Sequence, residues 1–402
     1  MGSALVLVLS ALLLIVLAPL LLAGGATRPD GFRGSLLQKK ATVDDDHPRL
    51  SRRRLSEPAG AVHIKGTGLY YVMELAVGTP PVTAQAIVAS SDLSWVECSP
   101  CSGCSTPAAA AGARRLYDRA NSSSFSPLPC ASKSCKILPE SSRNCSGTEC
   151  GYRYVYGATN TDYNYVQGKL GTETFRLTGA VGLGRTNLSL VGQLGLDRFS
   201  YCLSSNPESA SPILFGSTAQ MTGGGRIRST PLLHHYVDYS VNLLGISVNG
   251  TRLPIPNGTF ALDPTTGDGG FSFETSAPAT LLVDPAYTVV VEAFKARMSE
   301  NYKVVNGSGD LLCFMFDASK DVVVAAVPAM TMHFDGMDME LPWKNYFAFG
   351  KLKQSGDDVL CLMIGRSTAT SVIGSIMQMD FHVLYDLKNS LLFVQPADCS
   401  NV

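Results

Sequence analysis

Short β-rich runs closed by Gly and Pro constrain this chain more than any other feature. The first run spans residues 69–77 and ends at Gly78-Thr79-Pro80-Pro81, and similar runs recur as far as residue 394. With 38 Gly and 22 Pro, turns fall at short intervals, so short strands are expected rather than long helices. One helix is predicted after Pro285, because apolar side chains share a face there: Tyr287, Val291, Phe294 and Met298.

The length of 402 residues exceeds that of one ordinary domain and predicts two lobes, residues 65–210 and residues 211–402. A weak internal echo supports two related halves, because an apolar strand leads into Ala89-Ser90-Ser91 in the first and into Glu274-Thr275-Ser276 in the second. Two such units facing each other would form a cleft. The 32 basic and 33 acidic residues leave a net charge of −1, which argues against a nucleic-acid partner. We expect a mainly β, bilobal protein that acts as a monomer.

The amino-terminal residues are predicted to form a targeting sequence. Residues 4–23 are apolar apart from Ser10 and Pro19, and small residues follow, so residues 1–26 are predicted to be a signal peptide. The run is also long enough to cross a bilayer, so an uncleaved membrane anchor is the alternative. Residues 27–64 are polar and are predicted to be a pro-segment or flexible leader. We expect a secreted protein, extracellular or in the cell wall, with the vacuole or an N-terminal anchor as alternatives and membrane contact only if the leader is uncleaved.

Six Asn-x-Ser/Thr sequons support a secretory route, although a motif this short also occurs by chance. In a cysteine-rich chain with an apolar leader, six are more than a weak hint of glycosylation. The candidate acceptors are Asn121, Asn144, Asn187, Asn249, Asn257 and Asn306.

Eleven cysteines are many for a cytosolic protein, and the odd count requires one thiol without an internal partner. The spacing Cys98-x2-Cys101-x2-Cys104 resembles half a zinc site, but a fourth ligand is missing and an oxidising compartment favours disulfides. We therefore expect disulfides, no metal and no cofactor. A further group of four cysteines is expected to join the same network, with pairings that spacing does not decide: Cys130, Cys135, Cys145 and Cys150.

Several blocks taken together resemble the nepenthesin-like plant aspartic proteases of the pepsin-type family. The most specific blocks are residues 71–81, 92–98, 199–203 and the ending 371–399, and the resemblance covers residues 62–402. It implies a fold of two β-barrel lobes of the six-stranded type with a cleft between them. It also implies peptide-bond hydrolysis by two aspartates that face each other and share one proton, so that one acts as base while the other acts as acid.

The resemblance assigns further roles to individual residues. Tyr156 stands where the family's flap tyrosine closes over substrate, and Trp95 lies in the block that follows the first catalytic loop. Cys313 and Cys361 stand where a disulfide of the C-terminal lobe is expected. Cys202 with Cys399 is a plausible second link near the interlobe sheet.

Both catalytic positions depart from the family pattern. The first loop reads Ala89-Ser90-Ser91-Asp92, one residue short, so Ala89 occupies the catalytic position and Asp92 aligns with a later Asp of the motif. The second loop reads Glu274-Thr275-Ser276, in which Glu274 keeps a carboxyl group one methylene further out and Ser276 replaces a glycine. A lone glutamate has no twin with which to divide the acid and base roles.

The N-terminal lobe has also lost material. The flap reads Tyr156-Gly157-Ala158-Thr159-Asn160, and a family segment that includes one strand is missing between Phe175 and Val181. This predicts an incomplete N-terminal lobe with an unpaired sheet edge, unless neighbours rearrange or the gene model has skipped a piece. The missing segment carries one cysteine in the family, which places the predicted unpaired thiol among residues 98–150.

Three hypotheses on function follow. The favoured one is a secreted pseudoprotease that binds a peptide or protein in its cleft, or acts like an inhibitor on another secreted enzyme. The second is a weak or atypical aspartic endopeptidase that works through Glu274, which would be slow because each positioned acid or base is worth roughly 10²–10⁴-fold. The third is a degenerate family member that folds poorly.

Overall fold

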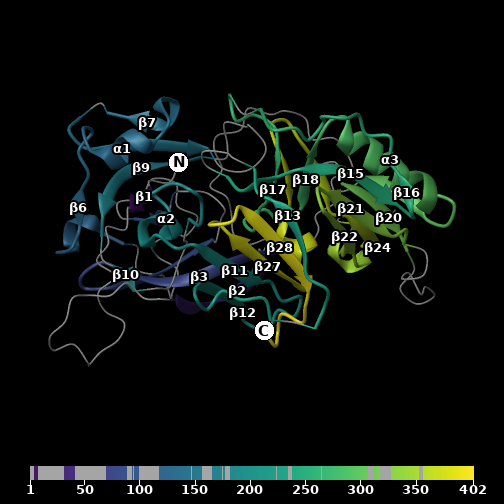
Figure 1. Ribbon diagram of the computed structural model, residues 1–402, viewed down its shortest axis with the longest axis horizontal. Helices are drawn as coiled ribbons and strands as arrows, with labels where there is room; N and C mark the ends of the chain where they lie inside the picture. The colour runs from purple at the N-terminus through teal and green to yellow at the C-terminus, as the bar shows by residue number, and fades with distance from the viewer. Residues whose placement is uncertain are drawn as a thin grey trace.

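The computed structural model describes residues 4–7, 31–40, 69–87, 93, 95–98, 117–145, 147–155, 165–173, 175–176, 182–222, 224–233, 238–263, 265–306, 311–316, 327–352 and 356–402. Its strands lie in two halves, with the N-terminal strands on the left of Figure 1 and the C-terminal strands on the right. A mainly β, bilobal architecture is therefore confirmed. The predicted barrels are not: within the described residues the strands form five open sheets, because their edge strands do not pair with one another.

The first sheet belongs to the N-terminal half and has the strand order β5-β1-β9-β8-β7, with β6 paired to β9. The disulfide-rich helix α1 (Lys133–Ile137) begins at Ser132, whose hydroxyl accepts from the Cys135 N–H as an N-cap. The strands are β1 (Ala4–Leu7), β5 (Trp95–Glu97), β6 (Ser126–Pro127), β7 (Arg143–Asn144), β8 (Gly151–Val155) and β9 (Tyr165–Thr172).

The second sheet has nine strands and joins the two halves. Its order is β10-β3-β2-β12-β11-β27-β28-β13, with β4 paired to β3, so strands from both ends of the chain lie in one layer. The strands are β2 (Gly31–Lys40), β3 (Leu69–Val77), β4 (Val82–Ile87), β10 (Phe175–Arg176), β11 (Arg198–Cys202), β12 (Ser211–Gly216), β13 (Arg228–Pro231), β27 (Phe381–Asp386) and β28 (Leu391–Pro396).

Three smaller sheets make up the rest of the C-terminal half, in the orders β14-β17-β26-β18-β25, β16-β15-β21-β22 and β19-β20-β24-β23. The first of them positions the candidate site. Their strands are β14 (Ser240–Val241), β15 (Leu243–Val248), β16 (Thr251–Arg252), β17 (Phe271–Phe273), β18 (Thr280–Val283), β19 (Lys303–Asn306), β20 (Leu312–Met315), β21 (Met330–Phe334), β22 (Met337–Leu341), β23 (Phe347–Lys351), β24 (Asp358–Leu362), β25 (Ile364–Ser367) and β26 (Ser371–Ile373).

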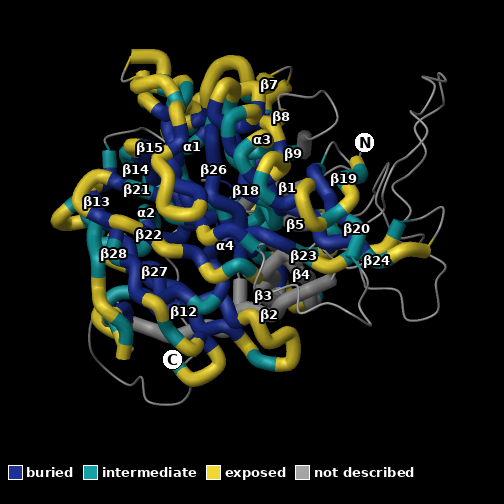
Figure 2. The backbone as a smooth tube through the Cα atoms, turned by 90° about the vertical axis from the view of Figure 1, so that its right-hand side faces the viewer, coloured by how far each residue is buried: buried dark blue, intermediate teal, exposed yellow. Residues whose placement is uncertain are grey.

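The predicted helix is confirmed as α3 (Ala286–Met298), with Pro285 at the N-cap. Tyr287, Phe294 and Met298 are buried as the spacing predicted, while Val290 rather than Val291 completes the fully buried face. Two short helices also pack into the core: α2 (Leu190–Leu194), which ends at Gly195 in the left-handed conformation, and α4 (Ser375–Gln378). Figure 2 shows β26 and β27 as largely buried strands, and one apolar cluster of buried residues includes members from Leu183 to Val394.

Two N-terminal segments lie inside sheets. β1 lies between β5 and β9, with Val6 opposite both Trp95 and Leu170, and β2 lies between β3 and β12. Within the described residues, β9 therefore pairs with β1 on one side and β8 on the other. Both segments fall within the ranges predicted as signal peptide and leader, and those assignments, like the boundary near residue 210, stay predictions.

Candidate functional site

Glu274 directly follows β17, and its own loop holds its carboxylate. The Ser276 N–H donates to Glu274 Oε1 over 2.8 Å, and the Ser276 hydroxyl donates to the same oxygen over 2.7 Å. The backbone N–H of Glu274 donates to the Ile373 carbonyl of β26 over 3.0 Å, which continues the parallel pairing of β17 with β26. The loop therefore still orients a carboxylate although a serine has replaced the glycine of the family motif.

The segment after β26 packs closely against this loop. The Gly374 N–H donates to the Thr280 hydroxyl over 3.0 Å, and a Cβ at Gly374 would lie 2.4 Å from the Ala279 carbonyl group. Behind it, Gln378 Nε2 donates to the carbonyls of Ile373 and Glu274 over 2.8 and 3.2 Å. Because Gln378 is fully buried, these bonds fix α4 beneath the carboxylate loop.

Two buried tyrosines complete the polar layer below Glu274. The Tyr201 hydroxyl donates to Gln378 Oε1 over 2.6 Å and lies 3.4 Å from the Tyr385 hydroxyl. Burial raises the pKa of both phenols well above the usual range, and for each of them the negative charge of Glu274 adds to the rise in pKa. Both tyrosines are therefore neutral hydrogen-bonding groups at any physiological pH.

One contact ties this site to the N-terminal half. Tyr239, next to β14, donates its hydroxyl proton to the carbonyls of Leu183 and Gly184 over 2.7 and 3.1 Å. The Arg185 guanidinium lies over the Tyr239 ring, 5.2 Å from its centre, and burial lowers the pKa of Arg185. The ring of Tyr239 also packs 4.9 Å from that of Tyr385, so residues 183–184 are held against the tyrosine layer.

The first catalytic position lies outside the described residues. Ala89 and Tyr156 both fall there, so the predicted first loop and flap stay predictions. Trp95 begins β5, where it pairs with Val6 of β1. The structure thus describes only Glu274 of the two predicted catalytic positions.

Four disulfides confirm most of the predicted network. Both pairs expected from the resemblance form, Cys202–Cys399 and Cys313–Cys361. The four cysteines whose pairing the sequence left undecided form Cys130–Cys145 and Cys135–Cys150. The sulfur atoms of Cys130, Cys135 and Cys145 lie close together, but they are disulfide sulfurs rather than metal-binding thiolates. Cys98 is buried, Cys101 and Cys104 lie outside the described residues, and the predicted unpaired thiol stays a prediction.

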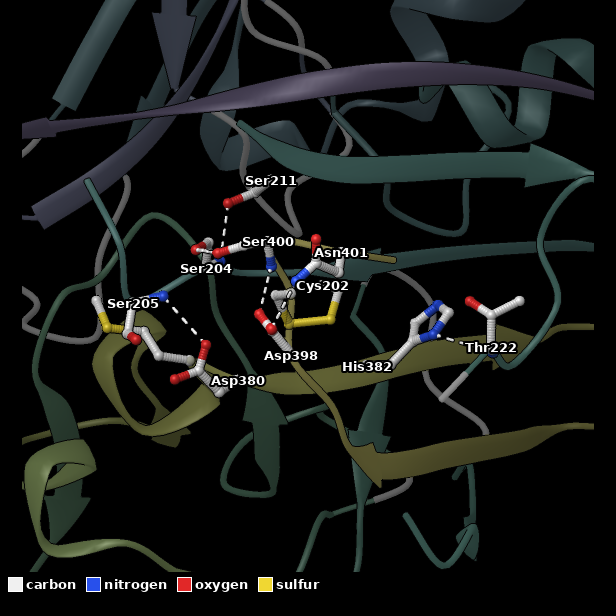
Figure 3. Close-up of a disulfide and its surroundings, with 12 residues drawn as sticks. Cys202, Ser204, Ser205, Ser211, Thr222, Asp380, His382, Asp398, Ser400 and Asn401 are labelled. Atoms are coloured by element: carbon white, nitrogen blue, oxygen red, sulfur yellow. Dashed lines mark hydrogen bonds between the residues drawn. A yellow bond between two sulfur atoms is a disulfide. The ribbon is translucent and has the colours of Figure 1, made fainter. Parts of the chain in front are cut away.

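Figure 3 shows how the Cys202–Cys399 disulfide holds the chain end beside β11. The Ser400 N–H donates to Asp398 Oδ1 over 3.0 Å, and the Ser205 N–H donates to Asp380 Oδ1 over 3.2 Å. His382 lies further along β27, where it accepts from the Thr222 N–H over 3.4 Å, and burial lowers the pKa of this imidazole. These residues anchor the C-terminus to the central sheet.

All six sequon asparagines are exposed, as glycosylation requires. They are distributed over both halves, from Asn121 in a 3₁₀ turn to Asn306 at the end of β19. Their modification stays a prediction.

A serine, a histidine and an aspartate that no motif in the sequence indicates are hydrogen-bonded to one another in the C-terminal half. The Ser247 hydroxyl lies 2.7 Å from His333 Nε2, and His333 Nδ1 lies 2.6 Å from Asp338 Oδ1. Ser247 sits in β15 with a partner strand on each side, so its backbone is engaged in pairing and offers no oxyanion hole. Alternation along β15, β21 and β22 could have placed the three on one face, and we interpret them as a cross-strand stabilising contact.

The sequence reading also missed Asp238, which lies two residues before β14. The charge of Glu274 and burial of the Asp238 carboxyl raise the pKa of Asp238 to about 6, with burial as the larger cause. A second carboxyl group thus stands near Glu274 within the same half.

This fold and this loop define a pepsin-type protein, and comparisons with known proteins agree. Residues 71–180 match the family described as xylanase inhibitor N-terminal, and residues 238–395 match xylanase inhibitor C-terminal. Aspartic proteinases nepenthesin-1 and nepenthesin-2 of Nepenthes gracilis are 35% and 34% identical, each over 82% of this chain and 78% of the relative. The chain belongs to the nepenthesin-like plant aspartic proteases.

Solved structures support the same fold. The crystal structure of edgp has a TM-score of 0.63 at 18% identity and covers 94% of this chain and 97% of its own. Basic 7S globulin from soybean has a TM-score of 0.59 at 21% identity, over 83% of this chain and 95% of its own. Among the described residues, no helix is long and apolar enough to cross a membrane; residues 8–30 lie outside them.

Proposed function

We propose that this chain is a secreted, non-catalytic member of the aspartic protease family that binds a polypeptide or another secreted enzyme. The observation that carries this proposal is which residue occupies the first catalytic position. Ala89 stands there, and a methyl group cannot hold or transfer a proton. Glu274 alone therefore lacks the facing carboxylate with which this chemistry divides its acid and base roles.

The retained framework supports a binding role. The Glu274 loop is still hydrogen-bonded by Ser276, and Gln378 and the two tyrosines still support it from below. The matching families carry the description xylanase inhibitor, which makes a secreted xylanase a reasonable first candidate partner. The six exposed sequons and the disulfides suit an oxidising, secretory environment.

A protease assay tests the loss of catalysis. Purified protein is incubated with acid-denatured globin between pH 3 and 6, with and without pepstatin, beside the Glu274→Gln variant. We expect no pepstatin-sensitive cleavage in either sample. Cleavage that pepstatin blocks and Glu274→Gln abolishes would instead establish the weak endopeptidase that works through Glu274.

A binding assay tests the positive part of the proposal. Immobilised protein is exposed to purified endoxylanases and, separately, to pepstatin as a peptidic probe of the cleft. Saturable binding of either supports the proposal. Failure of both, in protein that unfolds cooperatively, would leave the binding function without support, whereas failure to unfold cooperatively would favour a poorly folding family member.

A further inference from the structure

Strand register brings Asp238 near Glu274. β14 pairs antiparallel with β17, with Val241 opposite Phe271 and Ser240 opposite Ser272. The pairing ends at Ser240 of β14, and Asp238 forms a bend two residues before it. Extending the register by two residues nevertheless brings Asp238 to the end of β17 where Glu274 stands, and the charge of Glu274 acts on the Asp238 carboxyl.

Alternation puts both carboxyl groups on the side opposite the apolar core residues. Four apolar residues of the two segments are buried in the core, with exposures of 0–1%: Tyr239, Val241, Phe271 and Phe273. Of the residues between and beside them, Asp238, Ser272 and Glu274 are partly exposed and Ser240 is buried. Since successive side chains of a strand point to opposite faces, Asp238 and Glu274 share this partly covered face.

Two carboxylates so placed repel each other, and the repulsion is relieved when one of them takes a proton. The charge of Glu274 and the burial of Asp238 both act in this direction and raise the pKa of Asp238 to about 6. Asp238 is therefore protonated in mild acid and charged at neutral pH, whereas an ordinary aspartate is already charged at pH 5.

The other ionisable groups around the pair do not cancel this change. Tyr201 of β11 and Tyr385 of β27 interact with the charge of Glu274, and they stay neutral because their pKa values are raised. Arg185 reaches the ring of Tyr239, the residue next to Asp238, and an arginine stays cationic throughout the relevant range. Among the groups named here, all of them in described residues, the carboxyl pair is the one whose charge changes between pH 4 and 8; His234 and His235 lie outside the described residues.

We propose that Asp238 and Glu274 form a proton-sharing carboxyl pair that makes polypeptide binding at this site depend on pH. With one proton, the pair offers one O–H donor and one carboxylate acceptor, which together match the C=O and N–H of a peptide group. Without that proton the pair offers only acceptors and two negative charges. The site therefore binds a peptide backbone in acid and releases it near neutrality. This inference rests on the proposed binding function and names its regulation.

The first experiment tests the pair itself. Thermal unfolding midpoints are measured from pH 4.5 to 7.5 for the full chain, for Asp238→Asn and for the control Asp335→Asn, which removes an exposed aspartate. We expect the unfolding midpoint of Asp238→Asn to exceed that of the parent by an amount that grows between pH 4.5 and about 6 and then levels off. The midpoint of the control should differ from that of the parent by the same amount at every pH. If the midpoint of Asp238→Asn also differs from that of the parent by a constant amount at every pH, the proton-sharing pair is wrong.

The second experiment tests the effect on binding, with pepstatin as the probe at pH 4.5 and 7.5. The parent should bind at least tenfold more weakly at pH 7.5, and Asp238→Asn, which keeps a donor at both pH values, should lose most of that difference. Equal affinity of the parent at both pH values would overturn the pH dependence while leaving the binding function standing. No pepstatin binding at either pH would overturn peptide binding at this site, and the binding function would then stand or fall with the endoxylanase assay, whereas the unfolding series would still report whether Asp238 and Glu274 share a proton.

Discussion

The two halves of the molecule differ at the two loops that the family resemblance makes comparable. In the C-terminal half, the loop of Glu274 has two hydrogen bonds from Ser276 and rests on the buried Gln378. In the N-terminal half, the sequence has Ala89, which carries no ionisable group, at the position predicted to be its counterpart. The difference teaches that the carboxylate loop of the C-terminal half also has a structural role, because Gln378 and Tyr201 would lose buried hydrogen-bonding partners if that framework were lost.

The largest expected effect concerns the disulfide that joins the two halves, compared with one that lies within the N-terminal half. The Cys202–Cys399 link closes a separation of 197 residues, and the Cys130–Cys145 link one of 15. In the chain-entropy description, removing them costs about 5 and about 3 kcal/mol respectively. Denaturant unfolding of Cys202→Ser/Cys399→Ser and of Cys130→Ser/Cys145→Ser measures both. An equal or larger loss for the N-terminal pair would show that native-state effects outweigh loop length.

A smaller effect is expected where the halves touch. Tyr239→Phe leaves the buried carbonyls of Leu183 and Gly184 without their shared donor, which should lower the free energy of unfolding by about 1–3 kcal/mol. Tyr346→Phe is the matched control, because this buried hydroxyl bonds to one carbonyl, Pro328, inside the C-terminal half. We expect Tyr346→Phe to lower the free energy of unfolding by less than Tyr239→Phe does. A Tyr239→Phe variant as stable as the parent would mean that the contact between the halves contributes little.

The smallest effect is expected at the Ser247–His333–Asp338 contact. Its aspartate is more than half exposed, with 56% of its side chain accessible, so Asp338→Asn should change the free energy of unfolding by no more than about 1 kcal/mol. Chemical denaturation measures the change, with Asp335→Asn as an exposed control. Turnover of an activated ester by the parent that Ser247→Ala abolishes would contradict the purely structural interpretation.

The sequence predicted the mainly β class, the helix after Pro285 and the pairs Cys313–Cys361 and Cys202–Cys399, because these follow from turn spacing, helix periodicity and a family pattern. The pairing of the other four described disulfide cysteines stayed open, because spacing does not decide it. The sequence also identified Glu274, which departs from a motif at a recognisable position. It did not find Asp238, since that residue belongs to no motif and becomes relevant only through the register of β14 with β17. Nor did it foresee five open sheets in place of barrels, because sheet closure depends on long-range pairing that local pattern does not encode.

The order of the nine-stranded sheet has a consequence for how the chain is made. β2 and β12 come early in synthesis, whereas β27 and β28, which continue the same sheet beyond β11, are translated last. The sheet therefore stays open along β11 until residues 381–396 have left the ribosome, and the Cys202–Cys399 disulfide can form only afterwards. Long-range pairings of this kind fold slowly, so the unfinished edge of β11 is the surface that chaperones would have to shield.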